Sequence, residues 1–308
     1  MYSLTEIETE GLHYLELVST NGESRAQICL NQGGRLSALI FENIQILADY
    51  HPSTYKDNFA SAILFPFANR IKNGEYVFNK TNYKLNCNEA TKNNALHGLV
   101  YDKTFEYADS ILNSNFGAVT LRYNENENPI GFPFKFNIEL TYKLSESGIR
   151  LSVNVLNTDN KGFPFTLGWH PYFKTRDLYN SHLNFNSSIS YLVDDHQIPN
   201  GEVSFNETMP FQLKDTNLDT GYKLVDNQVE FLTPEYQLKI EATSVNNYLQ
   251  VYTPPDSNIL AIEPMTGAAD SFNNKMGLQI LNPKDNYTIQ WTLTIESETT
   301  NTTNHLNK

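Results

Sequence analysis

The chain has 308 residues, a formal net charge of −13 and a pI near 5.0. This acidic balance excludes a basic surface for phosphate backbones or anionic headgroups, so we expect neither nucleic acid nor membrane as a partner. The composition is rich in aromatic rings, with 18 Tyr and 18 Phe, which is typical of extended sheets and favours an all-β protein.

The N-terminus and the cysteines bear on the cellular compartment. The first ten residues, MYSLTEIETE, contain three Glu and no apolar signal core, and no later stretch is apolar enough to span a bilayer. Cys29 and Cys87 are too far apart for a CxxC motif and too few for a disulfide framework, so we expect buried or half-buried free thiols. The sequence predicts a cytoplasmic protein, with secretion of a longer precursor as the alternative.

Alternation of apolar and polar residues predicts half-buried strands along most of the chain. The first lies around residues 14–18, and another follows at 116–123. Residues 132–144 and 148–157 also alternate, and Gly148 closes the turn between them, which predicts a long antiparallel hairpin. Further strands are predicted at 237–243, 248–254 and 287–297.

The arrangement of these elements favours one antiparallel sandwich. Predicted strands outnumber helices several-fold and do not alternate with them, which argues against Rossmann and parallel-barrel folds. The sequence has no internal repeat and no Pro- or Ser-rich linker, so residues 1–296 are predicted to form a single domain. The polar tail at 297–308 has Leu306 as its one apolar residue, and we predict that this tail is frayed or disordered.

The sequence lacks the motifs of several cofactor sites. It contains no GxGxxG, GxxxxGK[ST], HExxH or GxSxG, which serve dinucleotide, phosphate-loop, zinc-protease and α/β-hydrolase sites. None of the seven histidines lies two or four residues from another, so the sequence indicates no metal cage. An enzyme with this sequence is expected to use ordinary acids and bases, without a metal or a cofactor.

Two ionisable residues stand next to apolar runs in the first third of the chain. Arg70, in ANRI, follows the apolar run LFPFA, where a guanidinium needs a carboxylate, a carbonyl or a ligand oxygen. A structural ion pair and a ligand contact are both open for Arg70. His97, in LHG, precedes a glycine that would let a bulky ligand approach the chain, although a His beside leucines is also common as a hydrogen-bonded core residue.

The segment TLGWHPYF, residues 166–173, surrounds His170 with aromatic side chains. The following proline favours an extended backbone at His170, and strand-end geometry would point the ring into a cavity. Trp169, Tyr172 and Phe173 offer flat apolar faces and polar edges, which sugars need for C–H contacts and hydrogen bonds. The alternative interpretation is an aromatic core that encloses a hydrogen-bonded His.

Glu263 provides the strongest local signal of a reactive side chain. It ends the continuous apolar run at 259–262 and precedes a proline. A carboxylate at the end of a buried strand is expected to have an elevated pKa, close to the range in which a general base works. The alternative is a Glu that is locked in an ion pair with one of the arginines.

In this order along a β-rich chain, ANRI, LHG, GWHPYF and IEP resemble the motifs of the aldose 1-epimerase (mutarotase) family, over about residues 10–296. The resemblance implies a galactose mutarotase-like β-supersandwich, mostly antiparallel and with few short helices. It further implies a monomer or homodimer without a redox cofactor. The implied activity is interconversion of the α and β anomers of a free monosaccharide.

The resemblance also implies roles for individual residues. Matched by motif, Glu263 is the general base and His170 the general acid. Opening a hemiacetal needs a base at the anomeric hydroxyl and an acid at the ring oxygen, so one carboxylate and one imidazole suffice.

The remaining matched residues are expected to bind the substrate. Arg70 and His97 correspond to residues that hold the oxygens of the sugar, and Asp219, in NLDTGY, corresponds to one that grips the substrate. Trp169 and its aromatic neighbours are expected to desolvate the site and to provide a platform for the sugar ring.

Two positions depart from the family pattern. Leu99 stands where galactose mutarotases have a second glycine after LHG, and Pro264 stands where they place a glutamine after the catalytic glutamate. These departures point to a broader branch than galactose enzymes, and the lack of a basic cluster argues against sugar phosphates. Two alternative functions remain: a non-catalytic carbohydrate-binding protein, or a glycoside hydrolase, which needs a second carboxylate such as Asp219 opposite Glu263.

Overall fold

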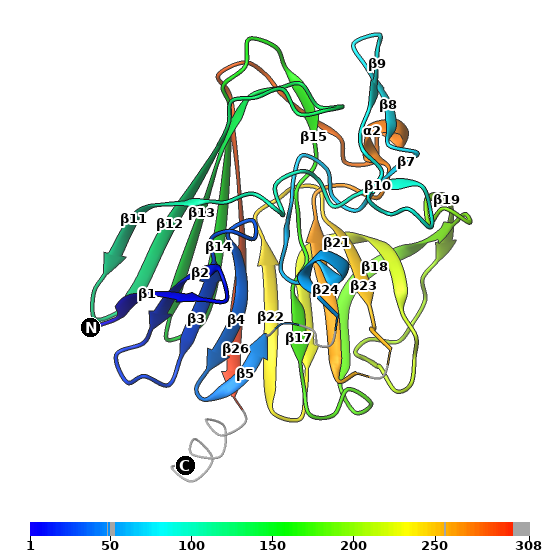
Figure 1. The fold of residues 1–308 in the computed structure, drawn as a ribbon. Helices are drawn as coiled ribbons and strands as arrows, with labels where there is room; N and C mark the ends of the chain where they lie inside the picture. Colours follow the sequence, from blue (N-terminus) through cyan, green and yellow to red (C-terminus); the bar gives the residue numbers. More distant parts are fainter. Residues whose placement is uncertain (48, 50–52, 256, 298–308) are drawn as a thin grey trace.

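The computed structural model describes residues 1–47, 49, 53–255 and 257–297 (Figure 1). Strands dominate this part of the chain, and its two helices, α1 (Tyr55–Asn58) and α2 (Ser271–Asn274), have four residues each. Neither of these described helices has the length and apolar character needed to cross a bilayer. The predicted all-β class, mostly antiparallel and with few short helices, is confirmed.

One half of the molecule is an antiparallel sheet of mostly long strands, at the left and rear of Figure 1. Each strand bonds to the next in the order β11 (Glu106–Leu112), β12 (Phe116–Glu125), β13 (Phe136–Ser145), β14 (Gly148–Asn157), β26 (Asn286–Ser297), β22 (Tyr236–Ala242). The predicted hairpin of 132–144 with 148–157 is present as β13 and β14, and Ser145 pairs with Gly148.

A second antiparallel run begins at the N-terminus and ends in the centre of the molecule. Its order is β1 (Ser3–Thr9), β2 (Leu12–Val18), β3 (Arg25–Cys29), β4 (Arg35–Phe41), β5 (Ile44–Leu47), β17 (Tyr172–Lys174), β24 (Ile259–Met265), β23 (Tyr248–Tyr252). The long strand β21 (Asp219–Leu232) joins the two runs, because its first half bonds to β23 and its second half to β22.

Shorter elements surround this framework. The long strand β18 (His182–Val193) pairs with β21 and carries β19 (Pro199–Ser204) and β20 (Phe211–Gln212). At the top of Figure 1, the β8–β9 hairpin and α2 lie near β7 and β10. The bounds of the remaining strands are β6 (Ile63–Leu64), β7 (Arg70–Lys72), β8 (Glu75–Phe78), β9 (Thr81–Lys84), β10 (Asn94–Leu96), β15 (Phe163–Phe165), β16 (Gly168–Trp169), β25 (Gln279–Leu281).

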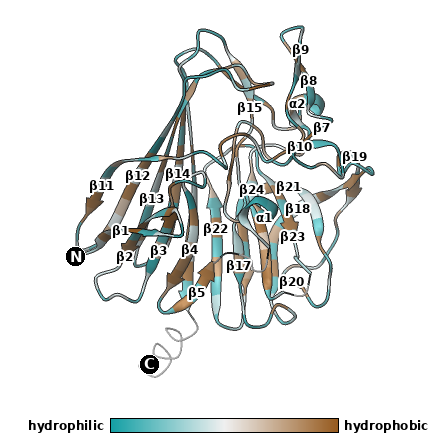
Figure 2. Cartoon of the chain, in the orientation of Figure 1, coloured by the Kyte–Doolittle hydropathy of each residue, from teal (hydrophilic) through white to brown (hydrophobic). Residues whose placement is uncertain are grey.

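The core lies between the two runs, because successive side chains of a strand point to opposite faces. On β14, Ile149, Leu151 and Val153 are buried while Arg150 is exposed, and Figure 2 shows hydrophobic and hydrophilic residues interleaved along many strands. Apolar residues of both runs belong to one buried cluster. The long strands of this sandwich form a rigid frame, on which the segments between strands can position functional side chains.

The structure locates the predicted thiols and the predicted end of the domain. Cys29 is buried and Cys87 is half-buried, both as free cysteines, and burial raises the pKa of the Cys29 thiol to about 11. Ser297 is the last residue of β26 and donates a hydrogen bond to Glu42, so the strand continues one residue past the predicted boundary at 296. The rest of the predicted tail, 298–308, lies outside the described residues.

Substitution of Gly148 tests the backbone geometry of the β13–β14 turn. Its φ is +130°, and a Cβ atom there would lie 2.1 Å from the carbonyl oxygen of Leu293 on β26. Gly148→Ala therefore combines backbone strain with a steric clash, and we expect a loss of about 2 to 4 kcal/mol in the free energy of unfolding, measured by urea denaturation.

Gly201→Ala on β19 is the matched control, because the nearest atom to its added Cβ lies 3.5 Å away, on the side chain of Leu192. This variant should stay within about 1 kcal/mol of the wild type. Equal stability of the Gly148→Ala and Gly201→Ala variants would contradict the turn geometry.

Candidate active site

A single cleft of about 250 Å³ brings together five of the six predicted site residues. They come from five separate segments: β7, the turn after β10, the link between β16 and β17, the start of β21, and β24. In chain order, these residues are Arg70, His97, His170, Asp219, Glu263.

The closest contact between predicted catalytic groups joins His170 and Glu263. His170 Nε2 lies 3.3 Å from Glu263 Oε1, and 6% and 3% of the two side chains are exposed. The main chain fixes His170, since its N–H donates to the carbonyl of Ala62 (3.1 Å) and its carbonyl accepts from the N–H of Ser61 (2.8 Å). Glu263 lies on the central strand β24, so two rigid segments hold this pair.

Burial shifts the pKa values of three cleft residues in the directions that favour their neutral forms. It raises the pKa of Glu263 well above its usual value, and the charge of Asp219 adds to this shift. It lowers the pKa of His170 to about 4, with a further contribution from the charge of Arg70. The pKa of His97 is also well below its usual value, because of burial and of the neighbouring His170 and Arg70. The protein alone therefore favours a neutral carboxyl and neutral imidazoles.

Three buried polar atoms of this group have no hydrogen-bond partner among the described residues. They are Nδ1 of His97, Nδ1 of His170 and Oε2 of Glu263. Buried polar atoms are nearly always paired in native proteins, so atoms of this kind gathered along one cleft indicate a polar ligand. Within the described ranges, no group of three His, Cys, Asp or Glu side chains is arranged to hold a metal ion.

The backbone places the His97 ring in an unusual way. His97 has a φ of +62° and donates its N–H to the carbonyl of Asn69 (2.8 Å). Its ring meets His170 edge-on at 4.9 Å and meets Phe59 at 4.8 Å. The two imidazoles and the aromatic ring thus pack as one unit beside the cleft.

The glycine of LHG has a different role from the one predicted. A Cβ atom on Gly98 would lie 2.3 Å from the carbonyl oxygen of Phe65, and the φ of Gly98 is +78°. The missing side chain therefore makes room for the main chain of Phe65, whose carbonyl accepts the N–H of Leu99 (2.7 Å). Gly98 serves the fold of the turn and not the approach of a ligand.

Arg70 forms the structural ion pair that was one of the two interpretations of its sequence context. Its Nε and Nη2 donate to the carboxylate of Glu89 at 3.0 and 2.9 Å, and its Nη1 donates to Oδ1 of Asn69 at 3.1 Å. Burial alone would raise the pKa of Glu89, but the bonds and the charge of Arg70 outweigh it and lower this pKa. Arg70 is thus an ion-paired residue that also lines the cleft.

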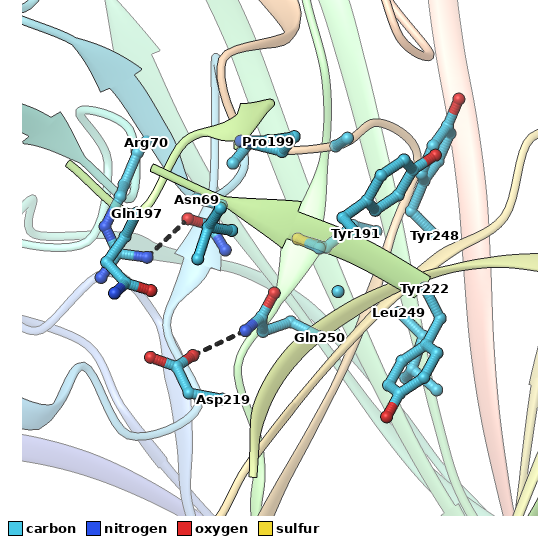
Figure 3. A pocket seen from close by; sticks show the side chains of 15 residues that line it. Asn69, Arg70, Tyr191, Gln197, Pro199, Asp219, Tyr222, Tyr248, Leu249 and Gln250 are labelled. Carbon is cyan, nitrogen blue, oxygen red and sulfur yellow. Dashed lines mark hydrogen bonds between the residues drawn. The ribbon is translucent and has the colours of Figure 1, made fainter. Parts of the chain in front are cut away.

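Asp219 lies at the start of β21 and is exposed. Its Oδ1 accepts a hydrogen bond from Nε2 of Gln250 (2.7 Å), as Figure 3 shows. Gln250 stands directly opposite Glu263 in the pairing of β23 with β24. Asp219 is therefore hydrogen-bonded to the residue that stands opposite the Glu263 carboxyl on the neighbouring strand.

The prediction that Trp169 forms the platform for a sugar is not supported by its position. The Trp169 side chain is fully buried, stacks on Trp291 at 6.3 Å and does not line the cleft. Trp169 precedes His170 in extended chain, and adjacent side chains there point to opposite faces. Tyr172, whose ring stacks on His170 at 4.9 Å, is one of the aromatic residues that do line the cleft.

The segment around α1 forms another wall of the cleft, and a buried arginine anchors it. Arg35 is 1% exposed, donates to Asp49 and Gln32, and lies 4.3 Å from the ring centre of Tyr55. The Tyr55 hydroxyl donates to the carbonyl of Tyr101 (2.8 Å). These contacts hold the short helix whose following residues reach the cleft.

The structure adds cleft residues that the sequence interpretation did not select. Glu89 stands in a polar stretch without a distinctive pattern, and Gln250 alternates with tyrosines on β23, so neither gives a local signal. Asn69 lies next to Arg70 within ANRI and is the one that the motif itself pointed to. The further residues that line the cleft are Asp57, Asn58, Phe59, Leu96, Tyr252.

Comparisons with known proteins identify relatives of the chain in sequence and in fold. A sequence model of aldose 1-epimerases matches residues 16–294. The Escherichia coli K12 protein YihR, described as uncharacterized, is 26% identical over 263 residues, which are 81% of this chain and 83% of YihR.

Two solved structures resemble the whole described fold. A galactose mutarotase-like protein from Clostridium acetobutylicum has a TM-score of 0.86 and 20% identity, with 96% of this chain and 99% of that protein covered. The galactose 1-epimerase from Lactobacillus acidophilus NCFM has a TM-score of 0.78 and 15% identity, with 96% and 99% covered. At these identities the likeness establishes the fold, which is the predicted galactose mutarotase-like β-supersandwich.

The raised pKa of Glu263 makes the stability of the protein depend on pH. A carboxyl whose pKa is raised in the folded state contributes to stability at pH values below its usual pKa of 4.5. This contribution is lost as the pH rises through the folded pKa. Since Gln does not titrate, the free energy of unfolding of the Glu263→Gln variant should rise relative to that of the wild type as the pH rises from 4 to 8. The gain should be about 1.4 kcal/mol for each pH unit between the unfolded and folded pKa values.

Urea denaturation at pH 4, 6 and 8 measures this difference. Glu296→Gln on β26 is the matched control, because Glu296 is exposed and lies outside the cleft. A stability difference between the Glu263→Gln variant and the wild type that stays constant over this pH range would rule out the assigned shift.

Proposed function

The chain belongs to the aldose 1-epimerase family, and from this premise we propose that it interconverts the α and β anomers of a free aldose. The observation that carries the proposal is the 3.3 Å contact between His170 Nε2 and Glu263 Oε1 inside the cleft. A buried acid–base pair beside further polar groups is what ring opening and closure require.

In the proposed reaction, Glu263 removes the proton from the anomeric hydroxyl while His170 delivers a proton to the ring oxygen. The bond between C1 and the ring oxygen breaks, and C1 becomes the carbon of an aldehyde. Rotation about C1–C2 presents the other face of the aldehyde. The ring then closes with both proton transfers reversed, which returns the pair to its initial protonation state.

The pKa shifts of the pair suit these two roles. A raised pKa makes the ionised Glu263 a stronger base, and a lowered pKa makes the protonated His170 a stronger acid. The two groups are in contact and hold one proton between them in the working form, so they titrate as a coupled pair. The same pair therefore serves the opening and the closing step.

The other cleft residues support binding of an uncharged sugar. Nδ1 of His97 lacks a partner among the described residues and is available to a sugar hydroxyl. Of the Arg and Lys side chains described, Arg70 alone lines the cleft, and Glu89 already neutralises it. Asp57 and Asp219 add negative charge, so a phosphate on the sugar would meet repulsion without a free cation.

The two alternative functions use less of the site. A carbohydrate-binding protein needs the polar walls but not a buried acid–base pair, whose neutral forms are maintained by burial. A glycoside hydrolase needs two carboxylates across the scissile bond, and Asp219 is the candidate beside Glu263. The hydrogen bond from Gln250 and the exposure of Asp219 support a binding role for this residue.

Substitution of the pair tests the proposed reaction. Glu263→Gln and His170→Ala should each lower kcat/KM for anomerisation by about 10² to 10⁴, because each removes one proton-transfer group. Polarimetry on freshly dissolved α-glucose, α-galactose, pentoses and deoxyhexoses measures the rates, and circular dichroism checks folding.

Glu296→Gln is the control and should retain the wild-type rate, and none of these proteins should release nitrophenol from aryl glycosides. Wild-type rates in both the Glu263→Gln and the His170→Ala variants would reject the catalytic assignment and favour a binding protein. Release of nitrophenol by the wild type would favour the hydrolase.

Charged sugars test the electrostatics of the cleft. We expect kcat/KM for a hexose 6-phosphate to be lower than that for the parent hexose by at least about tenfold, because Arg70 is already paired. Glu89→Gln removes the negative partner and should narrow this ratio. Equal values for the phosphorylated and the parent sugar in the wild type would show that the cleft accepts anions.

A further inference from the structure

A second, smaller cavity adjoins the cleft. It shares the wall formed by Asn69, Arg70, Asp219 and Gln250 with the cleft. Tyr191, Tyr248, Met265 and Ala268 form its opposite wall, and we call the part of the cavity next to these four residues the Met265 pocket. In Figure 3 the polar residues of the shared wall lie on one side, and Tyr191 and Tyr248 lie on the other.

The geometry of β24 fixes the distance of this pocket from the catalytic carboxyl. Met265 follows Glu263 by two residues, so both side chains point to the same face of the strand, with Cα atoms about 6.6 Å apart. On the neighbouring strand β23, Gln250 pairs with Glu263 and Tyr248 pairs with Met265. The pocket therefore lies two residues along β24 from Glu263. This is close enough for the pocket to receive a substituent of a sugar that reacts at Glu263.

The Met265 pocket is apolar and small. Tyr191, Tyr248, Met265 and Ala268 belong to one buried apolar cluster, and none of them is more than 8% exposed. The whole cavity, with the shared wall included, has a volume of about 20 Å³, whereas a single water needs roughly 10 to 15 Å³. The space thus fits one group of about the size of a methyl.

The two charged side chains that line this cavity, Arg70 and Asp219, lie on the wall shared with the cleft, and Gln197 is a further polar residue of the lining. Arg70 is paired with Glu89 and with Oδ1 of Asn69, and Asp219 accepts from Gln250. A sugar hydroxyl placed among the rings of the Met265 pocket would lie away from the polar side chains of the shared wall. The pocket therefore favours an apolar substituent, while the shared wall contacts the hydroxyls of the sugar ring.

We propose that the preferred substrate is a 6-deoxyhexose, whose methyl group occupies the Met265 pocket. The inference rests on the proposed function, because the sugar ring must lie over Glu263 for its substituent to reach Met265. Transfer of a methyl group from water into the pocket lowers the free energy of binding. A hydroxymethyl group at the same place needs more volume and would bury its hydroxyl without a hydrogen-bond partner. Both effects favour the deoxy sugar over its parent hexose.

The test compares three pairs of sugars on the whole chain: D-fucose with D-galactose, 6-deoxy-D-glucose with D-glucose, and L-rhamnose with L-mannose. For each pair, polarimetry gives the ratio of kcat/KM and calorimetry gives the ratio of dissociation constants. In the pair that contains the best substrate, the 6-deoxy sugar should be preferred on the order of tenfold.

Two variants in the pocket should change this preference in defined directions. Ala268→Val fills the space and should bring the ratio to one or below, because the methyl group no longer fits. Tyr191→Val enlarges the space and should raise kcat/KM of the hexose relative to its 6-deoxy partner. Both sugars are measured on one preparation, so the ratio does not depend on the fraction of folded protein.

Ala118→Val is the matched control, since Ala118 is buried on β12 and lies outside both cavities. It should keep the wild-type ratio. A wild type without preference, or with a preference for the hexoses, overturns the inference, and so does a ratio that Ala268→Val leaves unchanged.

Failure of the proposed function gives a different result. A wild type that accelerates no sugar, yet binds 6-deoxyhexoses more tightly, rejects the epimerase and keeps the pocket assignment. A wild type that neither accelerates nor binds any of the six sugars rejects both proposals.

Discussion

The burial of the Glu263 carboxyl against the His170 imidazole is the constraint on which the site depends. Ionisable groups at 2% and 5% exposure oppose folding whenever they are charged, so the frame must hold them in place at the expense of stability. The extended sheet provides this frame: β24 is bonded on both sides, and main-chain hydrogen bonds fix His170. Burial raises the pKa of Glu263 and lowers that of His170, which suits the roles of base and acid that we propose for them.

The positive charges near the cleft are also neutralised by neighbouring carboxylates. Arg70 is held by Glu89, and the more deeply buried Arg35 is held by Asp49, so the cations near the site act mainly as anchors for its walls. Among the described residues, the cleft that results combines polar groups with a single lining cation that is already paired, which suits the neutral sugar that we propose as substrate. The sheet places Met265 and Tyr248 beside the polar pair of Glu263 and Gln250. The proposed preference for a 6-deoxyhexose depends on this neighbouring apolar pocket.

The sequence predicts the strands well, because alternation along β13 and β14 directly reflects a buried and a solvated face. It also selects Arg70, His97, His170, Asp219 and Glu263, which one cleft then brings together. It fails where the answer depends on register or on contacts across the fold. Trp169 and His170 are adjacent, and only the strand geometry decides which of them faces the cleft. Glu89 and Gln250 are ordinary polar residues until β7 and β24 place them beside Arg70 and Glu263.

We propose that Glu263 and His170 move protons on a sugar bound in this cleft. Exchange NMR at equilibrium tests it directly, since it follows the transfer of magnetisation between the anomeric protons of the α and β forms without a change in composition. We expect protein-dependent exchange for at least one aldose with the wild type, and exchange at the spontaneous rate with the Glu263→Gln variant. Spontaneous rates with the wild type for every aldose, or equal exchange with the wild type and the variant, would contradict it.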